Sequence, residues 1–491
     1  MDYSSKLEWE FLQEAIDLTT FKIINDVPLY SIKSCYLKRG ENFEIILDIT
    51  CNLDERNLSF HENTYFLGEL ILENYKEIFK LNYCNLKHKS VSVGNIGEYH
   101  FIFHVNDIER TYKNHDLKNE TTYLKEWYLN SVHDKLVFTR STKYGVTKEY
   151  VKIRNNTPYD NVEFKEEYFP AMARDYLFLT LDDFKIILQK VPDEFGPKWS
   201  NNLGIEYHDV NNIPLQYIRK KTADMVSFLL GRNLIKIGET YYDSRWNVIG
   251  GVAISPNISS KLNLKTISNY RDLPAISYYD GFLDMFDWEI YSGEIINAYL
   301  KCDLDLSHVL ENLLMSMCLP TEAEIIIIGG CLDEISNKWF KSDRSPSKGK
   351  EINAKKFKNL ISKELKSIEK KLHDYPQIYK KIENSHSISG RKRVNLFLKE
   401  AGIKIGEMEE EARNSRNKPA HGHIISGETK SKLVYVTYVY RSFLNRIILK
   451  ILGFHSYYDL TNDEMKYVTE KISKKDLKDI KEYERLYYEY Y

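Results

Sequence analysis

The hydrophobic and polar positions of the first 280 residues mainly follow a period of two. Residues 42–49 form a short apolar and alternating run, and residues 99–105 and 135–139 alternate between apolar and polar side chains. Runs of this length, bounded by Asn, Gly and Asp, are typical of strands. The pattern therefore predicts a β-rich region in the first part of the chain.

Two helices are expected within this region. One is predicted at 182–190 and the other at 214–230, where a proline stands at the start and Gly231 follows the end. Proline fits the first turn of a helix, and glycine commonly ends one. A break near residue 155 suggests two N-terminal subdomains, 1–155 with mainly strands and 156–280 with mixed α/β structure.

From about residue 281 the period lengthens to that of a helix. Apolar residues recur on one face at three- and four-residue spacing, with Lys and Glu on the other face. A polar segment at 341–350, rich in Ser, Gly and Pro, predicts a loop. The sequence therefore predicts an α+β protein in which a helical domain, 281–491, follows the β-rich region. Its helices are expected at 322–340, 354–382, 394–417 and 430–452.

Composition sets the broad class of the protein. The chain has 491 residues and 43% hydrophobic side chains, enough to bury more than one core. Its six cysteines are scattered, without a CxxC pair or zinc-ligand spacing, which is typical of the reducing cytosol. The first residues lack the apolar segment of a signal peptide, and no apolar run is long enough to span a bilayer. We therefore expect a cytoplasmic protein with no membrane partner.

The net charge of −2 conceals an asymmetry along the chain. Residues 321–491 contain 34 Lys and Arg against 25 Asp and Glu, whereas residues 1–320 contain 35 against 46. A basic surface attracts a polyanion and an acidic one repels it. The C-terminal domain is thus the part expected to bind a polyanion such as RNA.

The candidate chemistry lies in the segment from Arg413 to His423, between two predicted helices. Pro419 would end a helix that runs through Arg416, and Gly422 adds a flexible corner. This arrangement puts a guanidinium at a helix end and the imidazole of His421 on the adjoining turn. Both groups can then face the same site.

An arginine and a histidine side by side suit RNA cleavage. The reaction removes the proton of a 2′-hydroxyl, stabilises extra negative charge at phosphorus and protonates the 5′-oxygen that leaves. Histidine titrates near neutral pH and can act as base or acid, whereas arginine stays charged and binds two phosphate oxygens. No metal is required when the 2′-hydroxyl is the nucleophile, so we expect neither a metal nor another cofactor.

At this point the residues are similar to a known family. Arg416-Asn417-x-x-x-His421, followed by Gly422 and set between long helices, resembles the R-x4–6-H motif of HEPN-domain proteins. The variant Arg-Asn-x-x-Ala-His-Gly most resembles the Apea-type HEPN domain of prokaryotic phage-defence proteins, which place a β-rich region ahead of it. The motif covers about ten residues and the architecture covers the whole chain loosely. The resemblance implies that the C-terminal domain is an all-α HEPN helical bundle.

The resemblance also implies roles for individual residues. The catalytic candidates are Arg416, Asn417 and His421, and the RNA-binding candidates are Arg413, Lys418 and His423. His423 also satisfies the spacing from Arg416 and stays an alternative catalytic histidine, although Ala-His-Gly favours His421. Related domains sometimes support the site with an acidic or polar residue on an earlier helix, for which Glu334 is the candidate.

The implied function is an antiviral, abortive-infection endoribonuclease that cleaves RNA, with tRNA as one candidate substrate. Two copies across a twofold axis would double the catalytic groups, so we expect a homodimer or higher oligomer. The acidic N-terminal region is expected to control the nuclease, with a phage-encoded protein as a possible trigger. One alternative is a non-catalytic HEPN sensor or scaffold that binds RNA or protein. Another is a helical bundle that only mediates oligomerisation.

Overall fold

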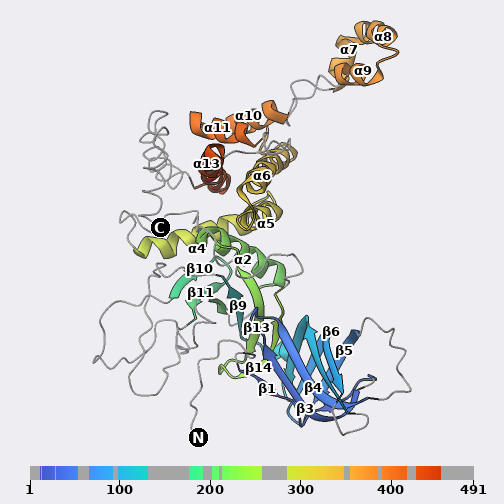
Figure 1. Ribbon diagram of the computed structural model, residues 1–491. Helices are drawn as coiled ribbons and strands as arrows, with labels where there is room; N and C mark the ends of the chain where they lie inside the picture. Colours follow the sequence, from blue (N-terminus) through green and yellow to red (C-terminus); the bar gives the residue numbers. More distant parts are fainter. Residues whose placement is uncertain are drawn as a thin grey trace. The chain divides into compact units, whose positions relative to one another are not determined.

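The protein consists of two compact units, seen in the computed structural model of Figure 1. The first contains residues 1–272 and 278–297, and the second contains residues 273–277 and 298–491. The predicted boundary at residue 155 lies outside the described residues. The structure describes residues 12, 14–27, 29–53, 66–91, 98–130, 176–191, 202–208, 213–256, 285–347, 354–383, 390–416 and 427–454.

The first unit is built on one antiparallel sheet. Its strands follow the order β1-β3-β4-β7-β6-β8-β14-β13-β9-β12-β11-β10, with β5 paired to β6 and β2 to β5. The predicted runs at 42–49 and 99–105 correspond to β4 and β7, while 135–139 is outside the described residues. The strands are β1 (Ile16–Asp17), β2 (Lys22–Ile23), β3 (Leu29–Arg39), β4 (Ile45–Leu53), β5 (Phe66–Glu73), β6 (Glu77–Val91), β7 (Glu98–Val105), β8 (Asp107–Tyr112), β9 (Tyr123–Leu129), β10 (Tyr176–Thr180), β11 (Lys185–Lys190), β12 (Leu203–His208), β13 (Ile235–Tyr242) and β14 (Val248–Ile254).

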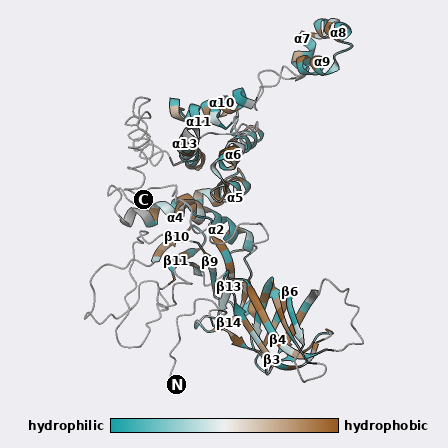
Figure 2. Cartoon of the chain, in the orientation of Figure 1, coloured by the Kyte–Doolittle hydropathy of each residue, from teal (hydrophilic) through white to brown (hydrophobic). Residues whose placement is uncertain are grey.

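Alternation along these strands builds the core of the unit. Ile45, Leu47 and Ile49 of β4 are fully buried, and the residues between them are partly exposed. They pack with Phe79 of β6 and Phe103 of β7 in one hydrophobic cluster. Figure 2 shows the resulting bands of hydrophobic residues on β3 and β4. The period-two pattern therefore corresponds to one buried sheet face, as expected for a strand.

The helices of this unit test the two helical predictions. They are α1 (Leu117–Glu120), α2 (Gln216–Leu230) and α4 (Met285–Leu300), whose last residues belong to the second unit. The helix predicted at 214–230 is confirmed as α2, which ends at Gly231 with a φ of 68°. The helix predicted at 182–190 is wrong, because Lys185–Lys190 is the strand β11, paired to β10 and β12. Its central residues are all buried, and such a short apolar run does not distinguish helix from strand.

A buried cluster of charges joins α2 to the sheet. Arg219 Nε of α2 donates to Glu126 Oε1 of β9 at 3.0 Å, and its Nη2 donates to Glu239 Oε2 of β13 at 3.1 Å. Lys236 Nζ bonds to the same two carboxylates at 2.5 and 2.7 Å. The Tyr207 hydroxyl donates to Glu126 Oε2 at 3.1 Å. Two positive and two negative side chains thus neutralise one another inside the unit.

A bulge in β13 gives this cluster its geometry. Residues three apart in a regular strand point to opposite faces. The register of β13 against β9 shifts between Lys236 and Gly238, so that Lys236 lies opposite Tyr128 and Glu239 opposite Glu126. The extra residue places Lys236 and Glu239 on the same face. Glu239 there contacts Arg219, and Lys236 contacts Glu126.

The second unit is helical in its described parts. None of the described helices is long and apolar enough to cross a membrane. α6 packs against α5, α10 and α13, and α11 packs on α13 (Figure 1). The helices are α5 (Ser307–Ser316), α6 (Thr321–Lys341), α7 (Ala354–Leu360), α8 (Ser362–Lys371), α9 (Pro376–Glu383), α10 (Gly390–Glu400), α11 (Glu407–Ser415) and α13 (Gly427–Ile451).

Two of the four predicted helices are each one continuous helix. The predictions at 322–340 and 430–452 correspond to α6 and α13, whose apolar faces form the core. The prediction at 394–417 is wrong as one helix, because Gly402 adopts a φ of 68° and ends α10 before α11 begins. Its N–H bonds to the carbonyl of Lys399, a local closure that glycine favours.

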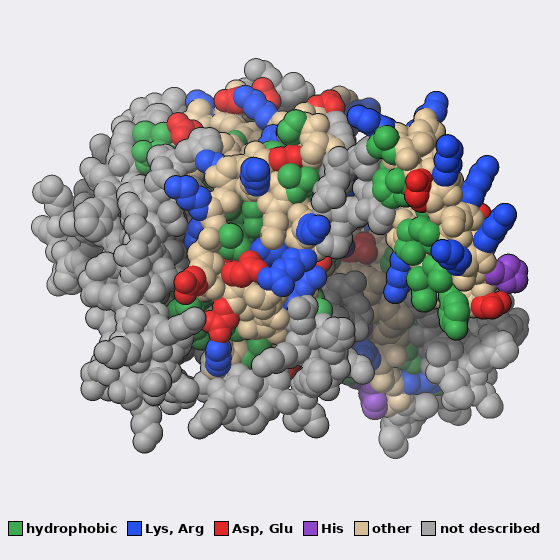
Figure 3. All heavy atoms as spheres, turned by 90° about the horizontal axis from the view of Figure 1, so that it is seen from above, with side chains coloured by type: hydrophobic (Ala, Val, Ile, Leu, Met, Phe, Trp, Pro, Cys, Tyr) green, Lys and Arg blue, Asp and Glu red, His purple; other side chains and the backbone are tan. Residues whose placement is uncertain are grey.

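The prediction of one helix at 354–382 is also wrong. The segment forms α7, α8 and α9, with Pro376 opening the last of them. Leu365 is the buried residue of α8, whereas Leu360 and Ile378 are 64% and 48% exposed. Figure 3 shows hydrophobic and Lys or Arg side chains together on the described helical surface. The amphipathic pattern was real, but its apolar face is only slightly covered within the described chain.

Candidate functional site

The structure places two of the six predicted site residues. Arg413 lies in the last turn of α11, and Arg416 is its C-terminal cap residue. The remaining candidates are outside the described residues, and their placement stays a prediction: Asn417, Lys418, His421 and His423. The described part of the site is therefore its arginine side, which the end of α11 presents.

Arg416 is held by two other helices. Its Nη2 forms an ion pair with Asp333 Oδ2 of α6 at 2.9 Å, and it hydrogen-bonds to the hydroxyl of Tyr440 on α13. Burial disfavours the charged guanidinium, but the carboxylate and the phenol outweigh this and raise the pKa of Arg416. The guanidinium is therefore fixed in direction and always charged.

Tyr440 is the second hydrogen-bond partner of Arg416. Its side chain is 1% exposed, and burial raises the pKa of its hydroxyl to about 12. The hydroxyl is therefore neutral at physiological pH, and its oxygen accepts a hydrogen bond from Arg416. A neutral acceptor orients the guanidinium without cancelling its charge.

A glycine makes room for the same side chain. A Cβ atom built on Gly329 of α6 would meet Arg416 Cδ at 2.5 Å and Nη1 at 2.6 Å. Glycine weakens a helix interior by about 1 kcal/mol relative to alanine. Its presence at this position allows the arginine to lie directly against the α6 backbone.

Arg416, Asp333 and Tyr440 line a hollow of about 350 Å³ in the second unit. Its wall comes from one face of α6, the first turn of α10, the end of α11 and Tyr440. Four arginines line it: Arg391, Arg393, Arg413 and Arg416. The space-filling view shows Lys and Arg side chains next to Asp and Glu on the described helical surface (Figure 3). A hollow of this size and charge suits a phosphate-bearing ligand.

Arg413, predicted to contact RNA, is largely occupied by a carboxylate. Its Nη1 donates to Glu410 Oε2 at 2.9 Å, and its side chain is only 9% exposed. Glu410 also bonds to Arg391 at the start of α10. Arg413 thus helps to tie α11 to α10, and its side chain is part of the wall of the hollow.

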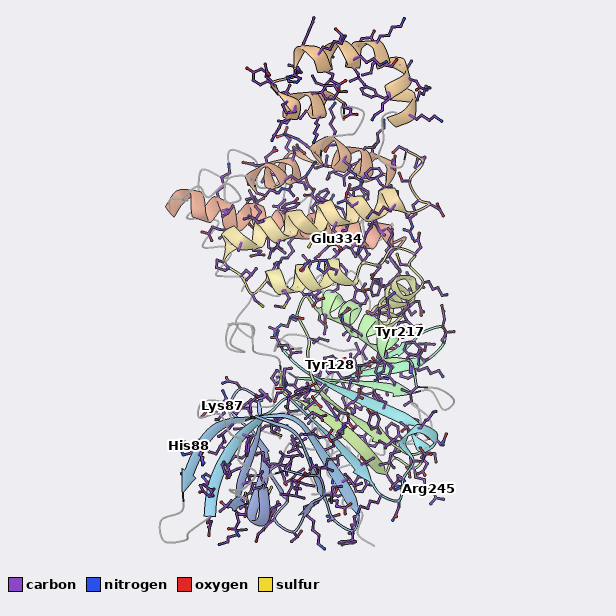
Figure 4. The ribbon with its side chains drawn as sticks, turned by 90° about the vertical axis from the view of Figure 1, so that its right-hand side faces the viewer. Lys87, His88, Tyr128, Tyr217, Arg245 and Glu334 are labelled. Carbon is purple, nitrogen blue, oxygen red and sulfur yellow. The ribbon has the colours of Figure 1, made fainter. Side chains whose placement is uncertain are left out.

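The supporting acid suggested by the sequence is replaced by its neighbour. Glu334 bonds to His308 Nδ1 of α5 and to Lys338 Nζ, each at 2.8 Å, and lies on the side of α6 toward α5 (Figure 4). These two partners lower the pKa of Glu334 against the opposing effect of burial. Consecutive residues of a helix point about 100° apart. Asp333 therefore faces Arg416 and Glu334 does not.

The sequence contained a signal for the acid that pairs with Arg416. Gly329, Asp333, Ser336 and Asn337 follow the spacing of one face of α6. Small and polar residues on one face of an otherwise apolar helix indicate a close neighbour or a ligand.

In the described chain no group of three or more His, Cys, Asp or Glu side chains could hold a metal ion.

Comparison with known proteins adds no relative. No family model, curated protein or solved structure matches this chain.

Proposed function

We propose that this protein is an endoribonuclease of HEPN type that cleaves RNA without a metal ion. The observation that carries the proposal is the anchoring of Arg416 by Asp333 and Tyr440 at the rim of an arginine-lined hollow. A guanidinium that is fixed in direction and still partly exposed can bind phosphate oxygens at this rim. The motif that begins at Arg416 supplies the histidine.

The proposed catalytic histidine is close to Arg416 in the sequence. His421 follows Arg416 by five residues, and five fully extended residues span at most about 18 Å. The proposal takes its imidazole to reach the hollow. His423 follows Arg416 by seven residues, a span of at most about 25 Å, and stays the alternative catalytic histidine.

The proposed chemistry divides the work between these residues. An imidazole takes the proton of the 2′-hydroxyl, whose oxygen attacks phosphorus, and the bond from phosphorus to the 5′-oxygen breaks. Arg416 binds the non-bridging phosphate oxygens and stabilises their added charge. A protonated imidazole then gives its proton to the 5′-oxygen. The products are a 2′,3′-cyclic phosphate and a 5′-hydroxyl.

One histidine is not enough to act as base and acid in the same turnover from one position. A second copy of the chain across a twofold axis would supply the other imidazole, so the proposed active form is a homodimer. The antiviral role and the control by the N-terminal region rest on the resemblance to phage-defence proteins. tRNA and a phage-encoded trigger protein are the proposed partners.

The test uses purified full-length protein and total RNA in EDTA. Wild type is expected to produce fragments with 2′,3′-cyclic phosphate ends, and Arg416→Ala and His421→Ala are expected to produce none. Arg245→Ala is the matched control, because Arg245 is an exposed arginine of the first unit (Figure 4). His423→Ala distinguishes the two histidines. Equal cleavage by wild type and Arg416→Ala would refute the proposal.

The assay also separates the runner-up function. A protein that binds RNA tightly but yields no fragments, even with infected-cell extract added, would be the non-catalytic sensor or scaffold. The ion pair between Arg416 and Asp333 is compatible with that reading, since a partly neutralised arginine still binds phosphate. Loss of phenotype from Leu444→Asp together with indifference to Arg416→Ala would instead indicate a bundle that only oligomerises.

A further inference from the structure

Arg393 lies in the first turn of α10 and lines the hollow. Among the four arginines there, it alone forms no ion pair with a carboxylate of the described residues. Arg391 and Arg413 bond to Glu410, and Arg416 pairs with Asp333. The guanidinium of Arg393 instead lies over the ring of Phe340, 5.4 Å from its centroid. Its buried Nε atom has no hydrogen-bond partner. The contact with the ring holds this guanidinium beside the hollow, and no described carboxylate neutralises its charge.

A second side chain with an unpartnered polar atom lines the same hollow from α6. Ser336 is 1% exposed and lines the hollow, and its hydroxyl has no hydrogen-bond partner. Buried hydroxyls nearly always have one, commonly a carbonyl of the preceding helical turn. Asn337, the next residue, also lines the hollow and adds an amide. Two side chains on different helices, Arg393 of α10 and Ser336 of α6, thus line the same hollow, and each has a polar atom without a hydrogen-bond partner.

The end of α10 adds a third favourable element. α10 has 11 residues and begins at Gly390, which lines the hollow. The N-terminal end of a helix carries partial positive charge from its first N–H groups and favours an anion. A Cβ atom at Gly390 would meet no atom of the described residues within 4 Å.

We infer that Arg393, Ser336 and the first turn of α10 form a second phosphate subsite, distinct from the one at Arg416. The inference rests on the proposed function, in that Arg416 is taken to hold the phosphate that is cleaved. The second subsite then binds a neighbouring phosphate of the same RNA strand. It fixes the register of the strand and makes a dinucleoside monophosphate, which has only the cleaved phosphate, a poor substrate.

The experiment measures binding separately from cleavage. A fluorescent RNA oligonucleotide with every 2′-hydroxyl methylated cannot be cleaved by the proposed reaction, and its binding to the full-length protein is followed by anisotropy. Arg393→Gln is expected to weaken binding about tenfold, the effect of one charge-assisted hydrogen bond. It should also reduce the slope of log affinity against log salt by about 0.7, the value for one single-strand phosphate. Lys399→Gln is the control, because it removes one charge from the exposed far end of α10.

Competition identifies the source of the phosphate. Displacement of the oligonucleotide by inorganic phosphate or adenosine monophosphate, absent in Arg393→Gln, would support a subsite that also takes free phosphates. Dependence on Arg393 without such displacement would support a subsite for the RNA strand alone. Equal affinities and salt slopes for Arg393→Gln and Lys399→Gln would overturn the inference.

Two further variants keep the result interpretable. Ser336→Ala removes only one oxygen, and it is expected to weaken binding about fivefold. If Arg393→Gln loses its thermal transition, unchanged affinity of Ser336→Ala overturns the inference and reduced affinity supports it. Failure of the proposed function looks different, because cleavage by Arg416→Ala would persist whatever these binding data show.

Discussion

Gly329 of α6 and Arg416 at the end of α11 lie so close that no side chain fits between them. A Cβ atom at position 329 would stand 2.5 Å from Arg416 Cδ, whereas one at the adjacent Gly330 would meet nothing within 4 Å. Gly329 is buried and Gly330 is exposed. Two consecutive glycines of one helix thus have different consequences for the site, and the pair provides its own control.

Gly329→Ala is predicted to displace Arg416 and to reduce RNA cleavage at least about tenfold, because a misplacement of about 1 Å can cost that much or more. The arginine is long and can swing aside, so the protein should still fold. Gly330→Ala is predicted to leave cleavage unchanged and to stabilise the helix by about 1 kcal/mol. Initial rates and urea unfolding of both variants measure the two effects. Equal rates for the two variants would show that the contact with Gly329 is irrelevant to activity.

Asp333→Asn is predicted to reduce turnover about tenfold while leaving RNA affinity equal or higher. The carboxylate orients Arg416 but also opposes the negative charge of RNA. The pair is 32% and 42% exposed, so stability should change by no more than about 1 kcal/mol. Glu334→Gln removes the same charge one residue away and should leave turnover unchanged. Separate values of kcat and KM for both variants decide the matter, and a higher KM alone would contradict a positioning role.

Tyr440→Phe is predicted to reduce cleavage about tenfold by removing an acceptor from Arg416. The hydroxyl has a pKa of about 12 because it is buried, so it does not titrate between pH 6 and 9. Wild type and variant should therefore have pH profiles of the same shape over that range, at different heights. A profile whose alkaline limb moves in Tyr440→Phe would show that the phenol takes part in proton transfer.

The same pKa predicts how the stability of the two proteins differs at high pH. A tyrosine whose folded-state pKa is raised stabilises the fold fully below its unfolded pKa, and this contribution is lost as pH rises toward the folded value. Between about pH 10 and pH 12, the free energy of unfolding should therefore fall less for Tyr440→Phe than for wild type. Taking the difference between the two proteins removes the contribution of their other tyrosines. A difference that stays constant over this range would mean that the pKa of Tyr440 is not raised.

Glu126→Gln is predicted to destabilise the first unit by about 3–5 kcal/mol, because it leaves Arg219 and Lys236 facing one acid instead of two in a buried setting. Lys220→Ala, in an exposed pair one residue from Arg219, should change stability by about 0.5 kcal/mol or less. Hydrogen exchange of peptides from β9 and α2 measures the loss locally. Similar exchange in both variants would show that the buried cluster does not stabilise this unit.

The sequence predicted the elements whose pattern is long or strictly periodic. β4, β7, α2, α6 and α13 were found because one face of each is buried, and burial is what periodicity records. β11 was missed because its run is short and buried on both faces. The break between α10 and α11 was missed because Gly402 acts through a backbone angle, which hydrophobic pattern does not record.

The candidate site was predictable only in part for a related reason. Arg416 belongs to a local motif, so the chain alone identifies it. Its partners Asp333 and Tyr440 come from helices distant in sequence, and their roles depend on which way each helix faces. Asp333 and Glu334 are adjacent in α6 and point about 100° apart. The expectation of an acid on an earlier helix does not say which of the two directions faces Arg416. Arg393 and Ser336 were recognised only once the hollow was visible.

The bulge in β13 has a consequence for the fidelity of folding. Lys236 and Glu239 meet Arg219 and Glu126 only in the observed register against β9. A slip by one residue would turn these side chains to the other face and leave buried charges without partners, at a cost of several kcal/mol. A register shift between these strands therefore costs more free energy than the same shift would cost in a strand pair with only apolar side chains. The charge cluster therefore favours the observed alignment of β13 with β9 over a shifted one.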